Sequence, residues 1–109
     1  MEEAILVVTT LPDANSAAQL GRMLVELKLA ACVTQLPPCT SIYRWQGEIE
    51  TAEEIPLLIK TLRRHYGKIE QAIRQHHPYE LPEIMAVTIA DGLPGYLAWV
   101  AAATIGNAE

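Results

Sequence analysis

The sequence predicts an α+β fold, a ferredoxin-like βαββαβ sandwich in which helices cover one face of an antiparallel sheet. Segments with strand and helix spacing alternate in the order strand, helix, strand, strand, helix, strand, and a short C-terminal helix follows. The second and third strands are expected to form a long hairpin. The chain has 109 residues, 50% of them apolar, and no internal repeat, so residues 1–109 are expected to form a single domain.

The first strand and helix follow from the spacing of apolar residues. Ala4–Leu11 is apolar and rich in β-branched residues, and Pro12 ends it, which is typical of a buried strand. Asp13 and Ser16 are residue types that start helices. The helix that follows carries its apolar residues at helical spacing, at Leu20, Met23, Leu24, Leu27 and Ala31.

Residues 32–45 and 49–61 predict the two long strands of the hairpin. Gln46-Gly47 is predicted to be its tight turn, because glycine tolerates the positive φ that such turns demand. Pro37-Pro38 breaks the first of these strands. Pro56 lacks the N–H that a strand ladder needs, so we expect an edge or a bulge at that position.

Residues 63–75 predict a second helix with Tyr66, Ile69 and Ile73 on its apolar face. His77-Pro78 ends this helix, because a residue before proline avoids helical angles. His65, on the basic side of the helix, is expected to face solvent.

The C-terminal part predicts one more strand and a short helix. The strand covers residues 84–90, and Asp91-Gly92 with Pro94-Gly95 turns the chain into the helix. The side chains expected to cluster on this helix are Tyr96, Trp99, Val100 and Ala103.

This arrangement predicts a homo-oligomer formed through strand pairing. The sheet face opposite the helices needs a cover, and only the short last helix is available for it. A straight strand over residues 32–45 would span roughly 46 Å, whereas a domain of this size has a diameter of about 34 Å. The hairpin must therefore bend at its prolines or overhang the body. An overhanging ribbon exposes strand edges and aromatic side chains, so Tyr43 and Trp45 are expected at the interface.

Charge and hydropathy exclude several classes of protein. Thirteen acidic against eight basic residues give a net charge of −5, which argues against binding to a phosphate backbone. No apolar stretch reaches the length of a membrane helix, and Glu2 and Glu3 precede the first apolar segment, where a signal peptide would carry bases. We therefore expect a soluble cytoplasmic protein with no partner among nucleic acids or membranes.

The two cysteines, Cys32 and Cys39, have neither CxxC spacing nor a matching zinc ligand set. On one strand they would lie roughly 23 Å apart, much farther than the ~7 Å limit for the Cα atoms of a disulfide. We expect two reduced thiols, with Cys32 buried and inert in its strand and Cys39 more accessible.

The segment after the second helix holds most of the residues that carry chemistry. His76, His77, Glu80 and Glu83 lie there, in a loop stiffened by two prolines. One interpretation is a metal or small-ligand site formed by imidazole nitrogens and carboxylates. The other is a helix end whose free carbonyls are satisfied by histidine side chains, and adjacent histidines need not share one ion.

Motifs of catalysis and nucleotide binding are missing from the sequence. Ser16 and Ser41 have no histidine near them in sequence, and no GxSxG, GxGxxG or P-loop motif occurs. Glu80 and Glu83 have the residue types of an acid–base pair, although their spacing says little about their separation.

Five segments together resemble the CutA divalent-cation tolerance proteins. They contain the motifs AxCV, YxWxG, KT and HPYExPE, and the resemblance extends over essentially the whole chain. The segments are residues 30–33, 41–49, 60–61, 77–84 and 96–99.

The resemblance implies a ferredoxin-like subunit in a tight homotrimer, similar in form to PII-type signalling proteins. It also implies a response to metal ions through copper or other divalent-cation binding, no established catalysis and no obligatory cofactor. The family's histidine ligands match His76 and His77, and its cysteine ligand falls at Thr9. A hydroxyl is a poor ligand for Cu(I), so Cu(II) or another divalent cation is expected.

Two alternatives stay open beside the metal-ion function. The first is a PII-like trimeric sensor that binds an anionic ligand in clefts between subunits, lined by Lys60, Tyr79, Glu80, Glu83 and the bases of the second helix. The second and weaker one is an enzyme that uses Glu80 or Glu83 in the same cleft.

Overall fold

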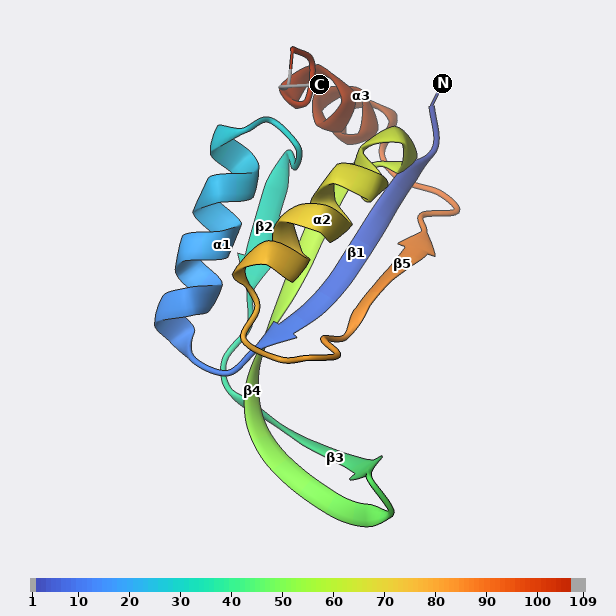
Figure 1. The fold of residues 1–109 in the computed structure, drawn as a ribbon. Helices are drawn as coiled ribbons and strands as arrows, with labels where there is room; N and C mark the ends of the chain where they lie inside the picture. The colour runs from blue at the N-terminus through green and yellow to red at the C-terminus, as the bar shows by residue number, and fades with distance from the viewer. Residues whose placement is uncertain (1, 107–109) are drawn as a thin grey trace.

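The computed structural model describes residues 2–106, so Met1 and residues 107–109 of the expected single domain lie outside it. The observed fold is the predicted α+β sandwich, with a mixed sequence of strands and helices and an antiparallel sheet (Figure 1). The elements are β1 (Ala4–Leu11), α1 (Ala14–Glu26), β2 (Cys32–Gln35), β3 (Cys39–Trp45), β4 (Glu48–Leu62), a 3₁₀ turn (Arg63–His65), α2 (Tyr66–His76), β5 (Ile84–Thr88) and α3 (Pro94–Ala103).

The sheet has the strand order β2-β4-β1-β5, and each neighbouring pair is antiparallel. β3 continues beside the distal part of β4, beyond the body of the sheet (Figure 1). β1 is therefore central, and it is paired on one side with β4 and on the other with β5.

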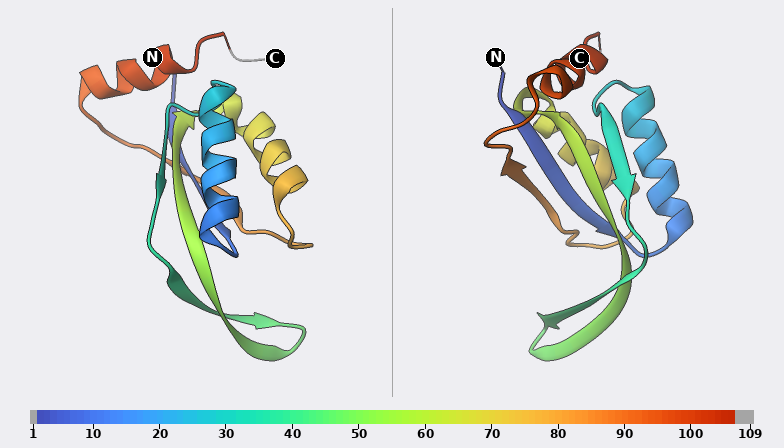
Figure 2. Two further views of the ribbon diagram at one scale, coloured as in Figure 1. Left: turned by 90° about the vertical axis from the view of Figure 1, so that its left-hand side faces the viewer. Right: turned by 180° about the vertical axis from the view of Figure 1, so that it is seen from behind.

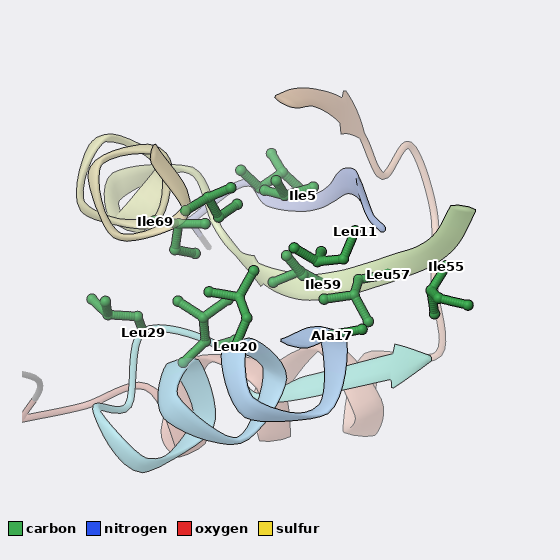
Figure 3. Close-up of a cluster of buried hydrophobic side chains, with 13 residues drawn as sticks. Ile5, Leu11, Ala17, Leu20, Leu29, Ile55, Leu57, Ile59 and Ile69 are labelled. Atoms are coloured by element: carbon green, nitrogen blue, oxygen red, sulfur yellow. The ribbon is translucent and has the colours of Figure 1, made fainter. Parts of the chain in front are cut away.

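The core lies between the sheet and the pair of helices α1 and α2 (Figure 3). In the body of the sheet, every second residue of the two central strands points toward the helices. The apolar ones among these are Ile5, Val7 and Leu11 of β1 and Ile55, Leu57 and Ile59 of β4. Burying apolar side chains of this kind stabilises the fold by about 1.5–3 kcal/mol each. The helices contribute Ala17, Leu20, Leu24, Ile69 and Ile73, all of them fully buried.

Asp13 and His77 lie at the start of α1 and at the end of α2, as the sequence predicts. Asp13 caps α1, and its Oδ1 accepts a hydrogen bond of 2.8 Å from the backbone N–H of Ser16. His77 follows α2 in an extended conformation, φ −89° and ψ 133°, as expected for a residue before proline.

The strand between α1 and the hairpin turn is interrupted at Pro37-Pro38, as predicted. Gln35 pairs with Leu57, and Cys39 pairs with Glu54. Residues 36–38 therefore lie opposite only residues 55–56, which is a bulge. Of the two expectations for Pro56, the bulge is confirmed and the edge is wrong, since β4 lies inside the sheet. The missing N–H of Pro56 is tolerated because it falls at this break in the ladder.

The hairpin turn has the predicted geometry, with φ of 52° at Gln46 and 82° at Gly47. The hairpin curves below the body of the molecule (Figures 1 and 2). β4 is visibly bent, since its 15 residues would span about 50 Å if straight, which is more than the longest extent of the protein, 44 Å. The hairpin therefore both bends at its prolines and overhangs.

The sheet face opposite α1 and α2 is largely uncovered (Figure 2). α3 packs across one end of it, where Val100 is buried with Ala4, Ala31 and Leu62. Farther along, Ile84 and Ala86 of β5 point into the core, so Met85 and Val87 point outward, and each is 52% exposed. We call this surface the open face. Its apolar members are Leu6, Val8, Leu58, Met85 and Val87.

Several details of the prediction are wrong. His65 is only 1% exposed, because the 3₁₀ turn before α2 directs it inward and leaves Arg63 and Arg64 outside. Leu27 is 42% exposed, since α1 ends at Glu26 and Leu27 is its C-cap. β5 ends at Thr88, two residues before the predicted end. Among residues 2–106, no helix is long and apolar enough to cross a membrane.

Candidate functional site

The loop after α2 forms one wall of a groove of about 740 Å³. The opposite wall comes from β3, with Ser41, Ile42, Tyr43 and Trp45. Thr10 of β1 and Glu54 of β4 complete the lining between these walls, and the loop contributes Tyr79, Glu80, Leu81, Pro82 and Glu83. The groove therefore joins four segments that are far apart in the sequence.

His77 fastens this loop to the sheet. Its side chain is only 8% exposed, and its Nε2 lies 2.5 Å from the carbonyl oxygen of Thr10. A carbonyl only accepts, so Nε2 carries the proton and donates. Nδ1 accepts a hydrogen bond of 3.1 Å from the backbone N–H of Tyr79. Both ring nitrogens of the neutral imidazole are thus engaged, and the ring lies 4.6 Å from that of Tyr79.

His76 differs from its neighbour in exposure and in bonding. It lies exposed in the last turn of α2, and its Nδ1 is 2.9 Å from the carbonyl oxygen of Ala72. Nδ1 therefore donates, and Nε2 is the nitrogen left to accept a proton or a metal ion. The two histidines are in different environments, one in solvent and one buried against β1.

Thr9, where the resemblance implies a cysteine ligand in the related proteins, is completely buried. Its Oγ1 has no hydrogen-bond partner among residues 2–106. A buried hydroxyl without a partner is uncommon, because it loses its bonds to water and gains none in return.

Glu54 is a carboxylate that the groove buries. It is 7% exposed, and it lines the groove together with Tyr79. The pKa of Tyr79 is raised above its usual value, first by burial and then by the negative charge of Glu54. No base lies within ion-pair distance of Glu54 in the described part of the chain, where the ion pairs of carboxylates involve Glu2, Glu3 and Glu26.

Lys60 belongs to a separate polar cluster on the open face. Its Nζ donates to Thr34 Oγ1 and lies 3.7 Å from Cys32 Sγ. Tyr96 of α3 also reaches this cluster, and its pKa is raised first by burial and then by Cys32. Lys60 lies six residues along β4 from Glu54, which corresponds to about 20 Å. Within one protomer, Lys60 is therefore not brought to the groove that holds Tyr79, Glu80 and Glu83.

Both cysteines are free, as predicted. Cys39 is exposed, and Cys32 is half-buried rather than buried. The prediction for Cys32 is wrong because strand alternation directs Val33 to the core and Cys32 to the open face, beside Lys60.

Sequence reasoning missed Glu54, which the structure places in the lining of the groove. A signal for its position is present, because Ile55, Leu57 and Ile59 mark one face of β4 and Glu54 shares the other with Leu58. Its burial depends on the distant loop, which the local pattern does not reveal. Across residues 2–106, no three side chains of histidine, cysteine or acidic type come together as a set that could hold a metal ion.

The family model described as "CutA1 divalent ion tolerance protein" matches residues 5–103. The divalent-cation tolerance protein CutA of Thermus thermophilus is 44% identical over 100 residues, which cover 92% of this chain and 95% of that protein.

Solved structures give the same result. CutA from Xylella fastidiosa superposes with a TM-score of 0.89 at 48% identity, covering 93% of this chain and 97% of that one. The protein of Archaeoglobus fulgidus, described as a periplasmic divalent cation tolerance protein, has a TM-score of 0.90 at 31% identity and covers 93% and 98%. This chain therefore belongs to the CutA1 divalent ion tolerance protein family.

Proposed function

We propose that this protein is a homotrimer that binds a divalent cation and acts in the response to metal ions, without catalysing a reaction. The observation that carries the proposal is the match of the divalent ion tolerance family over residues 5–103. The trimer is supported by the open face and the overhanging hairpin, whose Tyr43 and Trp45 remain 42% and 40% exposed in a single chain. Apolar surface of this kind marks interaction sites.

The proposed cation is held in part by His76. Because residues 2–106 of one chain bring no three ligand side chains together, the remaining ligands must be water or side chains of another copy. His76 offers Nε2, whereas His77 joins the site only if its ring gives up a bond to Thr10 or Tyr79. Nitrogen and oxygen ligands favour Cu(II) over Zn(II) and Ni(II).

Calorimetric titration of the metal-free protein with Cu(II) tests this site. His76→Ala is expected to weaken binding by about tenfold or more, and His76→Ala combined with His77→Ala to remove most of it. Gln75→Ala, on the same exposed turn, is the control and should bind as the parent does. Affinity should fall as the pH is lowered, because a metal-bound imidazole must be neutral. If the double variant binds Cu(II) as tightly as the parent, the histidines only terminate a helix and the proposed site is wrong.

Thr9 gives a second test of the same site. Thr10, next to it, accepts the hydrogen bond from His77, so a ligand at position 9 lies close to the histidine loop along β1. Thr9→Cys is therefore expected to raise the affinity for Cu(I), which prefers a thiolate to a hydroxyl. An unchanged Cu(I) affinity would show that this end of β1 takes no part in metal binding.

A PII-like sensor of an anionic ligand is the second candidate, and Lys60 favours it. This half-buried ammonium group has a hydroxyl and a thiol beside it, and no carboxylate within ion-pair distance in the described chain. A thermal-shift screen of metal-free protein with phosphate, citrate and ATP tests this function, since a ligand that binds only the folded state raises the melting temperature. The shift should disappear in Lys60→Met and persist in Lys28→Met.

We place the protein in the cytoplasm, and its two free thiols support this. The related protein of Archaeoglobus fulgidus is described as periplasmic, so the cellular location needs a direct test. Fractionation of cells that express the tagged chain should recover it with a cytoplasmic marker. Recovery with the periplasmic fraction would overturn this location.

A further inference from the structure

We propose that Cys32 and Lys60 form a covalent sulfur–nitrogen bond when the protein meets a hydroperoxide, so that the pair is a reversible, redox-sensitive link between β2 and β4. Both groups belong to the same chain. The link is a modification site separate from the proposed divalent-cation site at His76, and its reactants are hydrogen peroxide and related hydroperoxides.

The register of the sheet brings the two side chains together. Cys32 lies directly opposite Lys60 in the antiparallel pair of β2 and β4, and the backbone N–H of Ala31 donates to the carbonyl oxygen of Lys60 at 2.9 Å. Side chains of directly opposite residues leave the sheet on the same face, with their Cβ atoms about 4.5–5.5 Å apart. The backbone of one chain therefore fixes their proximity, which does not depend on what covers the open face.

The polar ends of these side chains also lie close to each other. Lys60 Nζ is 3.7 Å from Cys32 Sγ and donates a hydrogen bond to Thr34 Oγ1. Thr34 Oγ1 is in turn 4.0 Å from the same sulfur. Thr34 thus holds the end of the long lysine side chain beside the thiol, where a rotation of that side chain is enough to bring nitrogen and sulfur into bonding contact.

A disulfide within one chain is excluded for Cys32. The other cysteine, Cys39, lies opposite Glu54, whereas Cys32 lies opposite Lys60. Six residues of β4 separate these two positions, which corresponds to about 20 Å, and a disulfide needs Cα atoms within ~7 Å. A sulfenic acid formed at Cys32 therefore has the amine of Lys60 beside it and no thiol. Sulfenic acids condense with nitrogen as well as with thiols.

The reaction takes two steps. In the first, the Cys32 thiolate attacks one oxygen of hydrogen peroxide. An S–O bond forms, the O–O bond breaks, and the leaving hydroxide takes up the thiol proton as water. In the second, the Lys60 ammonium gives a proton to solvent, and the lone pair of the neutral amine attacks the sulfur. The S–N bond forms, the S–O bond breaks, and the leaving hydroxide takes a proton from the nitrogen as a second water.

The electron balance makes the link reversible. The sulfur is oxidised by two electrons, the peroxide is reduced to water, and the chain loses two hydrogens. Dithiothreitol returns the two electrons, because its thiols cleave the S–N bond, restore the thiol and the amine, and become a disulfide.

Peptide mass spectrometry of the Cys39→Ser protein after treatment with hydrogen peroxide tests the link, since Cys32 is then the single thiol of the chain. Trypsin does not cleave after a modified lysine, so the expected product is residues 29–44 joined to residues 45–63. It should be two hydrogens, about 2 Da, lighter than the two peptides together. Dithiothreitol should separate them. Neither peptide contains methionine, so methionine oxidation does not obscure the result.

Lys60→Arg keeps the positive charge and removes the nucleophilic amine. The joined peptides should then be lost, and Cys32 should instead gain oxygen as sulfinic or sulfonic acid. Lys28→Arg is the matched control, since Lys28 is an exposed lysine four residues before Cys32 that belongs to neither strand. It should give the joined peptides as the parent does.

Three results would overturn the proposal. If Cys32 stays reduced in the assembled protein under conditions that oxidise the unfolded chain, the oxidant does not reach the pair. If the two hydrogens are lost within residues 29–44 alone, the sulfur has bonded to a backbone nitrogen instead of Lys60. If Cys32 forms a disulfide with Cys32 of another copy, the thiols of neighbouring chains meet before the amine reacts.

Discussion

Thr9 and Thr61 are completely buried threonines of the two central strands, and their hydroxyl groups differ in hydrogen bonding. Thr61 Oγ1 donates to the carbonyl oxygen of Leu29 at 2.6 Å, whereas Thr9 Oγ1 has no partner among the described residues. Thr9→Val should therefore stabilise the protein by about 1 kcal/mol, since a methyl group replaces a desolvated hydroxyl of the same shape.

Thr61→Val is the matched control for this prediction and should destabilise the protein by about 1–3 kcal/mol, because it leaves the Leu29 carbonyl without its donor. Thermal unfolding at one fixed protein concentration measures both variants. Destabilisation by Thr9→Val would mean that its hydroxyl is satisfied in the protein in solution.

Single residues also show where sequence reasoning stops. The periodic apolar positions Ile69 and Ile73 are predicted correctly, because helical spacing alone determines their face. His65 and Glu54 are not, because the burial of a polar side chain depends on a 3₁₀ turn in one case and on a distant loop in the other. The hydrogen bonds of His77 join residues 67 positions apart, and no local pattern encodes them.

At the scale of elements, the start of α1 depends on a charged cap. The hydrogen bond from the Ser16 N–H holds the pKa of Asp13 below its ordinary value of 3.8. A carboxyl group whose pKa is lower in the folded state contributes stability above its unfolded pKa and loses it as the pH falls through the folded value. Asp13→Ala should therefore lower the melting temperature at neutral pH.

The difference between Asp13→Ala and the parent should shrink as the pH falls below 3.8. Asp13→Asn separates charge from capping, because an asparagine caps a helix as well as an aspartate does and does not titrate. Melting curves recorded from neutral pH to acid pH check both variants. A difference that stays constant with pH would show that the carboxylate charge has no part in the cap.

The hairpin turn offers a test of backbone conformation that leaves all side-chain contacts intact. Gly47 has φ of 82°, where a residue with a Cβ atom is strained by about 1–2 kcal/mol, and no heavy atom lies within 4 Å of a Cβ added there. Gly47→Ala should destabilise the hairpin by this amount through strain alone. Gln46, with φ of 52°, should be improved by Gln46→Asn, since asparagine tolerates this region better. Thermal unfolding of both variants should give shifts of opposite sign.

The elements themselves are the part of the structure that the sequence predicts best. Strong local signals mark them: Asp13 at the start of α1, Gln46-Gly47 at the turn and His77-Pro78 after α2. Their ends are less well determined. β5 ends at Thr88, which pairs with Ile5 near the start of β1, so the length of this strand depends on pairing as well as on composition.

At the scale of the whole molecule, the groove explains why the candidate site was only partly predictable. The loop after α2 was identified from its histidines, prolines and carboxylates, all of which lie in one segment. The second wall comes from the hairpin, and Glu54 comes from β4, so the site exists only after the hairpin has curved below the sheet. The prolines at 37 and 38 predict the break in the strand, whereas the direction in which the hairpin curves after the break depends on pairing with β4.

The open face and the hairpin together predict that the protein assembles. Light scattering at low micromolar concentration should report about three times the chain mass of 12.0 kDa. Val87→Glu puts a charge on the open face, where it is tolerated in a single chain because Val87 is 52% exposed. In the trimer this charge would be buried without a partner, so the variant should have a lower mass or a lower melting temperature.

Val25→Glu on α1 is the control, since Val25 is also a half-exposed valine, at 41%, but lies on the helical side of the molecule. A parent protein that stays monomeric, or a Val87→Glu variant that assembles as the parent does, would show that the open face is not the surface through which the copies associate.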